Sequence, residues 1–250
     1  AVGYVAGSSI TTGTQNTLIG GLAGDAITTG SNNVAIGYLA LSTEDGNGRN
    51  VAIGTSALQT LNAGSDGNNT GVGYFAGYAV TTGTGETFIG SLAGDATTTG
   101  ADNTGVGYQA LTSNTTAANN TAVGVSALKL NTTGAGNTAI GRGSLLNQTT
   151  GIDNTAVGRD AGNDITTGNY NAILGSLAGD ALTDADFNVA VGYHALSSDT
   201  LGSRTTAVGQ GALFSQNFTS ATDTYNTAVG YAAGVNVTTG VQNTLIGGLA

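Results

Sequence analysis

The chain has 250 residues, of which 43 are Gly, with no Pro, Trp, Met or Cys and only 8% charged residues. Its formal net charge of −10 argues against the basic stripe needed for nucleic acid and against binding to anionic membranes. The lack of Cys excludes disulfides and thiolate metal sites, and no run of about 18 apolar residues could span a bilayer. We therefore expect a thin object with closely spaced backbone layers, with no nucleic-acid partner and no membrane insertion in this segment.

A branched aliphatic residue followed by Gly recurs along the whole chain, as in the stretch Asn120–Leu128. The motif occurs fifteen times, and twelve of the fourteen intervals between its glycines are seventeen residues long, as from Gly20 to Gly37. The two exceptions run from Gly54 to Gly73 and from Gly209 to Gly230. Both are longer, as expected if the extra residues lie in surface turns. A fixed period in this range predicts a solenoid, in which each repeat packs on its neighbours.

We number each repeat from its Asn, so that Asn120 is position one and Gly124 is position five. Side chains alternate along a strand, so positions two and four face one side and position three faces the other. Position four is always branched aliphatic or Leu, and we predict that it points inward. Position three is usually Ala or Gly, and a strand that is apolar on both faces is expected to be buried on both. The predicted core residues of the repeat are Val2, Ile19, Ile36, Ile53, Val72, Ile89, Val106, Val123, Ile140, Val157, Leu174, Val191, Val208, Val229 and Ile246.

The positions after this predicted strand indicate a second packing rule. Position eight is Ala in fourteen copies and Ser144 in the other, so we infer that a wider side chain does not fit. Position nine is either Gly or Leu. Copies with Gly carry an apolar residue at position twelve, such as Ile27, except for Thr97, and copies with Leu carry a polar residue there, such as Gln148, except for Leu61. We infer that each coil needs one apolar plug, supplied from either position and contributing on the order of 1.5 to 3 kcal/mol.

Spacers between the motifs combine Thr pairs with Gly, as in Thr11-Thr12-Gly13 and Thr81-Thr82-Gly83. We predict that these glycines supply positive φ where the chain reverses. The fold class expected is all-β, a parallel β-solenoid of about fifteen such coils with two short strands per coil and no helix. The chain begins at position three of a repeat and ends at position eight, so we expect residues 1–250 to be a single repeat array, excerpted from a longer one.

The sequence Asn-Val-Ala-Ile-Gly, at Asn33–Gly37 and Asn50–Gly54, is followed after two residues by Ala. This pattern resembles the head repeat of YadA-type trimeric autotransporter adhesins, whose unit is shorter than the period found here. The Asn-Thr-Ala-Val-Gly-Tyr-x-Ala-Leu arrays are similar to those in the shafts of bacteriophage tail fibres. The resemblance covers the whole chain and implies a left-handed parallel β-roll packed as a homotrimer. Independently of it, position three lacks a partner in its own chain, and identical chains around a common axis would cover that face.

Few residues suggest chemistry. His194 is the only histidine and occupies position seven, which holds residues as different as Leu and Asp in other coils, so we expect it to face solvent. A triad can be written with Ser197, Ser198 or Asp199, but neighbours on one strand and its turn would not converge as a triad requires. We therefore predict no catalytic residues and no enzyme.

Asp25, Asp95 and Asp180 follow Gly in the shared run Leu-Ala-Gly-Asp-Ala. Their repetition is compatible with Ca²⁺ sites, yet no copy has the alternating acidic ligands or the Gly-Gly-x-Gly-x-Asp pattern of calcium-binding rolls. We favour the alternative that each Asp satisfies backbone amides in its turn. The prediction is therefore no cofactor and no metal, with Ca²⁺ as the weaker alternative.

Tyr occupies position six in six coils and could form a broken ladder along the solenoid. Such a ridge could stack on sugars and serve as a surface ligand ridge. We favour the simpler alternative, in which each ring covers the edge of the roll while its hydroxyl stays in water. The six residues are Tyr4, Tyr38, Tyr74, Tyr108, Tyr193 and Tyr231.

Taken together, these features predict a non-enzymatic structural shaft of a trimeric surface fibre, a phage tail fibre or similar appendage that supports host attachment. The alternative is a trimeric bacterial adhesin head that binds host, matrix or glycan through its lateral surface. An ice-binding solenoid is a remote alternative, because the Thr pairs lie beside Gly in turns and many coils lack them. We expect an extracellular location, on a virion or bacterial cell surface. The expected partners are further copies of the chain in a homotrimer and a host-surface receptor or glycan.

Overall fold

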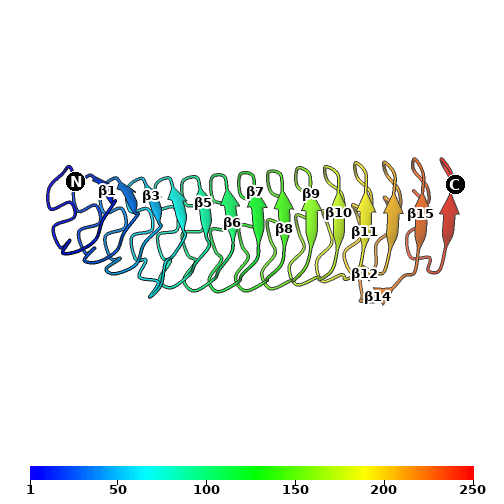
Figure 1. Cartoon of the computed structure of the whole chain (residues 1–250). Coiled ribbons are helices and arrows are strands. Elements are labelled where there is room, and N and C mark those ends of the chain that lie inside the picture. The colour runs from blue at the N-terminus through cyan, green and yellow to red at the C-terminus, as the bar shows by residue number, and fades with distance from the viewer. The chain divides into compact units, whose positions relative to one another are not determined.

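The computed structural model describes all residues 1–250, which divide into two compact units, Ala1–Asn120 and Thr121–Ala250. Each unit is a parallel β-solenoid, and the chain forms about 14 turns with no helix. Figure 1 shows the strands of each unit lying side by side in chain order. The chain accordingly has no helix that could span a membrane. The predicted all-β parallel solenoid is confirmed, whereas a single array over residues 1–250 stays a prediction.

Every strand of the main ladder covers positions two to four of one repeat and is three residues long. Neighbouring strands pair in parallel with equivalent positions opposite each other, as in Thr17 with Val34 and Ile19 with Ile36. The strands of the first unit are β1 (Thr17–Ile19), β2 (Val34–Ile36), β3 (Val51–Ile53), β4 (Thr70–Val72), β5 (Thr87–Ile89) and β6 (Thr104–Val106).

The second unit continues the same pattern and adds one pair of strands. β12 (Gly202–Ser203) and β14 (Thr222–Asp223) form a separate two-stranded parallel sheet beside the long repeat between Gly209 and Gly230. Elsewhere each coil has one strand, so the prediction of two strands per coil is wrong. The main-ladder strands of this unit are β7 (Thr121–Val123), β8 (Thr138–Ile140), β9 (Thr155–Val157), β10 (Ala172–Leu174), β11 (Val189–Val191), β13 (Thr206–Val208), β15 (Thr227–Val229) and β16 (Thr244–Ile246).

The lack of a second strand follows from the backbone corners of each coil. Positive φ recurs at positions five, seven and nine and at the last position before the next Asn. In one coil these angles are 140° at Gly158, 54° at Asp160 and 57° at Gly162, preceded by 54° at Asp153. A left-handed residue other than Gly costs about 1 to 2 kcal/mol and interrupts extended structure. Only positions two to four are therefore left as a regular strand.

The glycines of the Thr-Thr-Gly spacers are not among these corners. Gly13 and Gly83 lie outside the left-handed region, so the prediction that they supply positive φ is wrong. Their role is steric. A Cβ added at Gly13 would lie 2.4 Å from the carbonyl oxygen of Gly30, in the next coil. Gly is required because adjacent coils approach each other there backbone to backbone.

The interior side of the strand is position three. Ala122 and Ala139 are fully buried, whereas Ile19 at position four is 42% exposed and Leu174 is 50% exposed. The prediction that position four points inward is therefore wrong in the single chain. The expectation that position three lacks a partner in its own chain is wrong as well, because the face left for another chain to cover is that of positions two and four. Strand alternation separates the two faces but does not say which is interior. The interior opposite the strand is already occupied by the plug, so most coils have room only for Ala or Gly at position three.

The predicted plug is confirmed. Leu128 and Leu145 at position nine are fully buried, as are Ile27 and Ile165 at position twelve of Gly-type coils. Ala at position eight is fully buried in the interior coils, which agrees with the inferred size limit. In Leu-type coils the polar residue at position twelve is buried as well. Gln148 donates from Nε2 to the Gly151 carbonyl oxygen at 2.6 Å, so position twelve points inward whichever residue occupies it.

Large buried residues at position three lie in Gly-type coils. Leu18, Phe88 and Ile173 are buried there, and the Gly at position nine makes space for them. A Cβ added at Gly94 would lie 2.4 Å from the Phe88 ring. Thr97 belongs to the same coil as Phe88, which supplies the apolar volume that Thr97 lacks. The residue at position three therefore fills the coil interior together with the residues at positions nine and twelve.

A buried ladder of side-chain amides links position one of successive coils. The Asn154 backbone N–H donates to Oδ1 of Asn137 at 2.9 Å, and Asn154 Nδ2 donates to the Gly168 carbonyl oxygen at 2.8 Å. The Asn50 backbone N–H likewise donates to Oδ1 of Asn33 at 3.0 Å. These bonds satisfy buried backbone groups between coils that no strand pairing reaches.

Candidate functional site

Positions two and four of the strands form the outer face of each unit, an uncharged surface of Thr and aliphatic side chains that is left uncovered in the single chain. Position two is Thr, Val or Ala and position four is Val, Ile or Leu, so no charged residue lies on this face in any coil. A partly exposed, uncharged surface that contains an aliphatic side chain in every coil is suited to a protein contact. The most exposed residues at position four are Val2, Ile19, Ile89, Ile140, Leu174, Val229 and Ile246.

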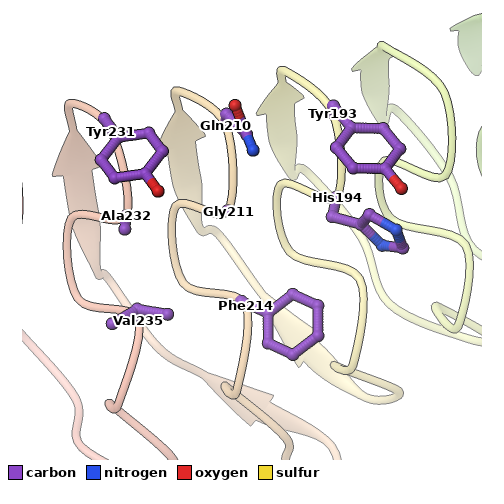
Figure 2. A pocket seen from close by; sticks show the side chains of 8 residues that line it. All are labelled: Tyr193, His194, Gln210, Gly211, Phe214, Tyr231, Ala232 and Val235. Carbon is purple, nitrogen blue, oxygen red and sulfur yellow. The ribbon is translucent and has the colours of Figure 1, made fainter.

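A pocket of about 220 Å³ lies on three successive coils of the second unit, at positions six, seven and ten. Figure 2 shows Tyr193 and His194 on one coil and Tyr231 on the coil after next. The lining combines four rings, one amide and small apolar groups, and it contains no acidic or basic residue other than the imidazole. The lining residues are Tyr193, His194, Gln210, Gly211, Phe214, Tyr231, Ala232 and Val235.

The pocket exists because position seven is small in two consecutive coils. A Cβ added at Gly211 would meet no atom within 4 Å, so the space above it is open. The next coil has Ala232 at this position. Other coils fill the same place with side chains such as Leu22 and Leu39. The shape of the pocket is therefore set by two missing side chains.

His194 forms one wall of the pocket and is half-buried, so the expectation that it faces solvent holds only in part. Its ring contacts Tyr193 edge-on with centroids 4.1 Å apart, and Phe214 with centroids 5.8 Å apart. The Nδ1 atom of His194 is buried with no hydrogen-bond partner in the chain. A buried polar atom without a partner is uncommon in folded proteins and requires an explanation.

The structure does not assemble the triad that could be written around His194. Asp199 is fully buried, and its carboxylate accepts bonds from the backbone N–H groups of Gly202 at 3.1 Å and Phe218 at 3.0 Å. Its other oxygen accepts from Gln216 Nε2 at 2.7 Å. Asp199 thus holds the long repeat together rather than orienting an imidazole.

Asp25, Asp95 and Asp180 each keep one buried carboxylate oxygen without a hydrogen-bond partner. Burial raises the pKa of Asp95, against the opposing effect of backbone hydrogen bonds from Asp95 and Ala96. Burial also raises the pKa of Asp180, and the charge of nearby His194 counters part of that rise. The predicted role of these Asp residues in their turns stays a prediction. No group of three or more His, Cys, Asp or Glu residues is placed to hold a metal ion.

Glu86 occupies position one, where most coils have Asn, and is fully buried. Its Oε2 accepts from the Asn103 backbone N–H at 3.1 Å, and its Oε1 accepts from Asn103 Nδ2 at 3.1 Å. Burial raises the pKa of Glu86 to about 8, and the nearby Asp102 charge adds to the rise, whereas the Asn103 bonds oppose it. The carboxyl group continues the amide ladder at this one coil.

The six Tyr residues at position six are all exposed, from 49% at Tyr108 to 81% at Tyr4, which fits rings at an edge with wet hydroxyls. Only Tyr193 and Tyr231 line the pocket. A second aromatic arrangement at the last position of the repeat has no counterpart among the sequence predictions. Tyr170 stacks on Phe187 with centroids 5.1 Å apart, and the Arg204 guanidinium lies 4.8 Å from the centre of the Phe187 ring.

The Thr pairs make bonds between coils. The first Thr hydroxyl of a pair donates to the carbonyl oxygen of the equivalent residue one coil later, as Thr149 does to Thr166 at 3.1 Å and Thr166 to Thr183 at 3.2 Å. These hydroxyls are therefore occupied by the fold, which weakens the remote ice-binding alternative.

Comparison of the chain with protein-family models, with curated proteins and with solved structures gave no significant match. The resemblance to adhesin heads and tail-fibre shafts is therefore carried by the repeat motif alone.

Proposed function

We propose that the protein is a non-enzymatic structural shaft of a trimeric surface fibre, which holds a host-attachment part away from its base. The observation that carries the proposal is the outer face. Every coil presents an uncharged side chain at position two and a branched aliphatic side chain or Leu at position four, in phase with its neighbours. A surface that repeats identically at each coil is suited to contact with an identical chain.

The energetic argument favours assembly along the whole face. Covering the exposed part of each position-four side chain contributes roughly 1 kcal/mol, because full burial of such a side chain is worth about 1.5 to 3 kcal/mol. The contributions accumulate coil by coil, so even a weak contact per coil becomes a stable interface over a unit. Three copies and a left-handed roll are what the resemblance to tail-fibre shafts and adhesin heads implies.

The proposed shaft needs neither catalysis nor a cofactor. The chain carries one histidine and no cysteine, and Asp199 bonds to its own turn. The proposed location is extracellular, on a virion or a bacterial cell surface. The acidic net charge keeps such a Gly-rich surface soluble between partners.

Light scattering coupled to size exclusion tests the assembly. The expected mass is three times the 24.2 kDa of the chain. Val123→Lys places a charge on the outer face and should reduce the mass to that of one chain without loss of the β-type circular dichroism. Ser126→Lys, at position seven of the same coil, is the matched control and should leave the mass unchanged. A folded monomer of the unmodified chain at all concentrations would refute the trimer.

The alternative is a trimeric adhesin head that binds host, matrix or glycan through its lateral surface. The observation that favours it is the aromatic pocket lined by Tyr193, Phe214 and Tyr231. A shaft requires only uniform coils, whereas this pocket breaks the uniformity at one place. A binding measurement on the pocket therefore separates a pure spacer from a binding module.

A further inference from the structure

We propose that the pocket around Gly211, called here the Gly211 pocket, binds a single neutral sugar ring. Its lining is the set of eight residues named above, all within the second unit. The inference concerns one chain and needs no assembly, so it can fail or succeed independently of the proposed shaft.

The size of the Gly211 pocket limits the ligand to one ring. Its volume is about 220 Å³. Sites for drug-sized ligands are typically about 300 to 1,000 Å³, so an extended molecule could place only one unit inside. The open space above Gly211 and the short side chain of Ala232 form the floor, where neighbouring coils would present larger groups.

The lining has the mixed character that a pyranose requires. A sugar ring has apolar C–H faces and hydroxyls around its edge. Tyr193, Phe214 and Tyr231 offer large apolar rings, of which the two Tyr carry hydroxyls that can bond at the rim. Gln210 adds an amide that can both donate and accept. Figure 2 shows Gln210 on the coil between the two Tyr residues.

His194 contributes to one wall of the Gly211 pocket. Figure 2 shows its imidazole turned away from Gly211, and its Nδ1 is buried rather than open to the pocket. The polar group available to a ligand is therefore the Gln210 amide, together with the two Tyr hydroxyls. A purely apolar occupant would give this amide no hydrogen-bond partner in place of water, at a free-energy cost.

Charge determines which sugars fit. No Lys or Arg lines the Gly211 pocket, and the chain has a net charge of −10. A sialic acid or a uronic acid would bring an anion to a site with no cation to pair with it. The pocket therefore favours neutral hexoses and N-acetylhexosamines over acidic sugars.

Saturation-transfer NMR on the full chain tests the assignment. The probes are methyl β-galactopyranoside, methyl α-glucopyranoside, methyl α-mannopyranoside and N-acetylglucosamine, with N-acetylneuraminic acid as the anionic comparison. We expect transfer to ring protons of at least one neutral probe, with a Kd on the order of 1 to 10 mM, as is usual for a ligand of this size. The anionic probe should show at least roughly tenfold weaker binding.

Gly211→Leu is the decisive variant, because it fills the pocket with a side chain that the repeat already accepts. Leu22 and Leu39 occupy the same position with φ of 56° and 58°, close to the 65° of Gly211. The variant should fold and lose the transfer signal. Ser126→Leu introduces the same side chain at the same position of another coil, outside the Gly211 pocket, and should retain the signal.

One further variant keeps the test conclusive. Phe214→Ala removes one ring and should abolish transfer even if Gly211→Leu folds poorly. Transfer that persists in both Gly211→Leu and Phe214→Ala overturns the site. Absence of transfer to every neutral probe, or equal binding of the anionic probe, overturns the ligand class.

Discussion

Ala139 and Ile140 are neighbours on β8, yet the smaller residue is fully buried and the larger is 40% exposed. This order is opposite to that of an ordinary globular core, where Ile is among the most buried residues. This contrast between the two faces of the strand indicates that the available volume restricts which side chains fit the interior. The side chains of the outer face are restricted only by the surface that packs upon them. The predictions below test this contrast, from the largest expected effect to the smallest.

The interior should be most sensitive at the plug. Leu145 is fully buried, and Leu145→Ala should lower the free energy of unfolding by about 2 to 5 kcal/mol, since it leaves a cavity that the coil cannot close. Urea unfolding followed by circular dichroism measures the loss. A change below about 1 kcal/mol would mean that the plug does not support the coil.

The coupling between positions nine and twelve offers a rescue of that loss. Leu145→Gly combined with Gln148→Ile converts this coil to the Gly type found in the next coil, with Gly162 and Ile165. The double variant should recover roughly half or more of the stability lost in Leu145→Gly, because the plug is restored from the other position. Simple additivity of the two changes would contradict a shared plug.

Overfilling the interior should cost less than emptying it. Ala139→Val adds two methyl groups at a fully buried position and should destabilise the chain by about 1 to 3 kcal/mol. The position-three residue of this coil lies opposite Leu145 at position nine, not opposite Gly. If Ala139→Val is neutral, the interior is not limited by volume.

The buried carboxyl group of Glu86 should make the interior respond to pH. Its pKa in the folded chain is about 8, above the value of 4.5 for an exposed Glu. The folded chain therefore keeps a proton that the unfolded chain has already released. The contribution of Glu86 to stability is fully present below about pH 4.5 and is lost as the pH rises towards about 8. One bound proton changes the free energy of unfolding by at most about 1.4 kcal/mol per pH unit, so we expect a decrease on the order of 1 kcal/mol between pH 5 and pH 6.

Glu86→Gln is the matched control for this pH effect. It cannot ionise and can still accept the bond from the Asn103 backbone N–H through its amide oxygen. Urea unfolding at pH 5, 6, 7 and 8 should give a smaller slope for the variant than for the unmodified chain. Identical slopes would show that Glu86 is not the source of the effect.

The outer face should respond least in the isolated chain. Ile140→Ala should lower the free energy of unfolding by less than about 1 kcal/mol when measured where the protein is monomeric, because much of the side chain is already in water. The same substitution should weaken the proposed assembly, seen as a lower mass by light scattering. If Ile140→Ala lowered the free energy of unfolding of the monomer as much as Ala139→Val does, the two faces of the strand would not differ in the way described.

Much of the fold could be predicted from the sequence because the repeat displays its own constraints. The regular period indicated the solenoid, and the complementary choice at positions nine and twelve, as in Leu145 with Gln148 and Gly162 with Ile165, revealed the plug. Both features are visible in the sequence because every coil packs the same interior positions. Coils that depart from the pattern are therefore few.

Which face of the strand is interior could not be predicted, because side-chain alternation is the same for both faces. Small Ala139 and large Ile140 are equally compatible with either side until the volume of the coil is known. The Gly211 pocket was likewise hidden. It depends on two small residues, Gly211 and Ala232, that lie beside each other only when the coils are stacked. The signal available in the sequence was the small residue at position seven in consecutive repeats.

The Asn ladder couples each coil to its neighbours, and this coupling has a consequence for how a unit forms. The backbone N–H of Asn171 donates to Oδ1 of Asn154, and the N–H of Asn188 donates to Oδ1 of Asn171, each at 2.9 Å. Each bond of the ladder forms only when both of its coils are in place, so the ladder favours adding a coil next to one that has already formed, on either side. Within a unit, folding is expected to begin at one formed coil and to proceed by adding neighbouring coils one at a time. Amide hydrogen exchange should then be slowest in the middle of a unit and fastest at its ends.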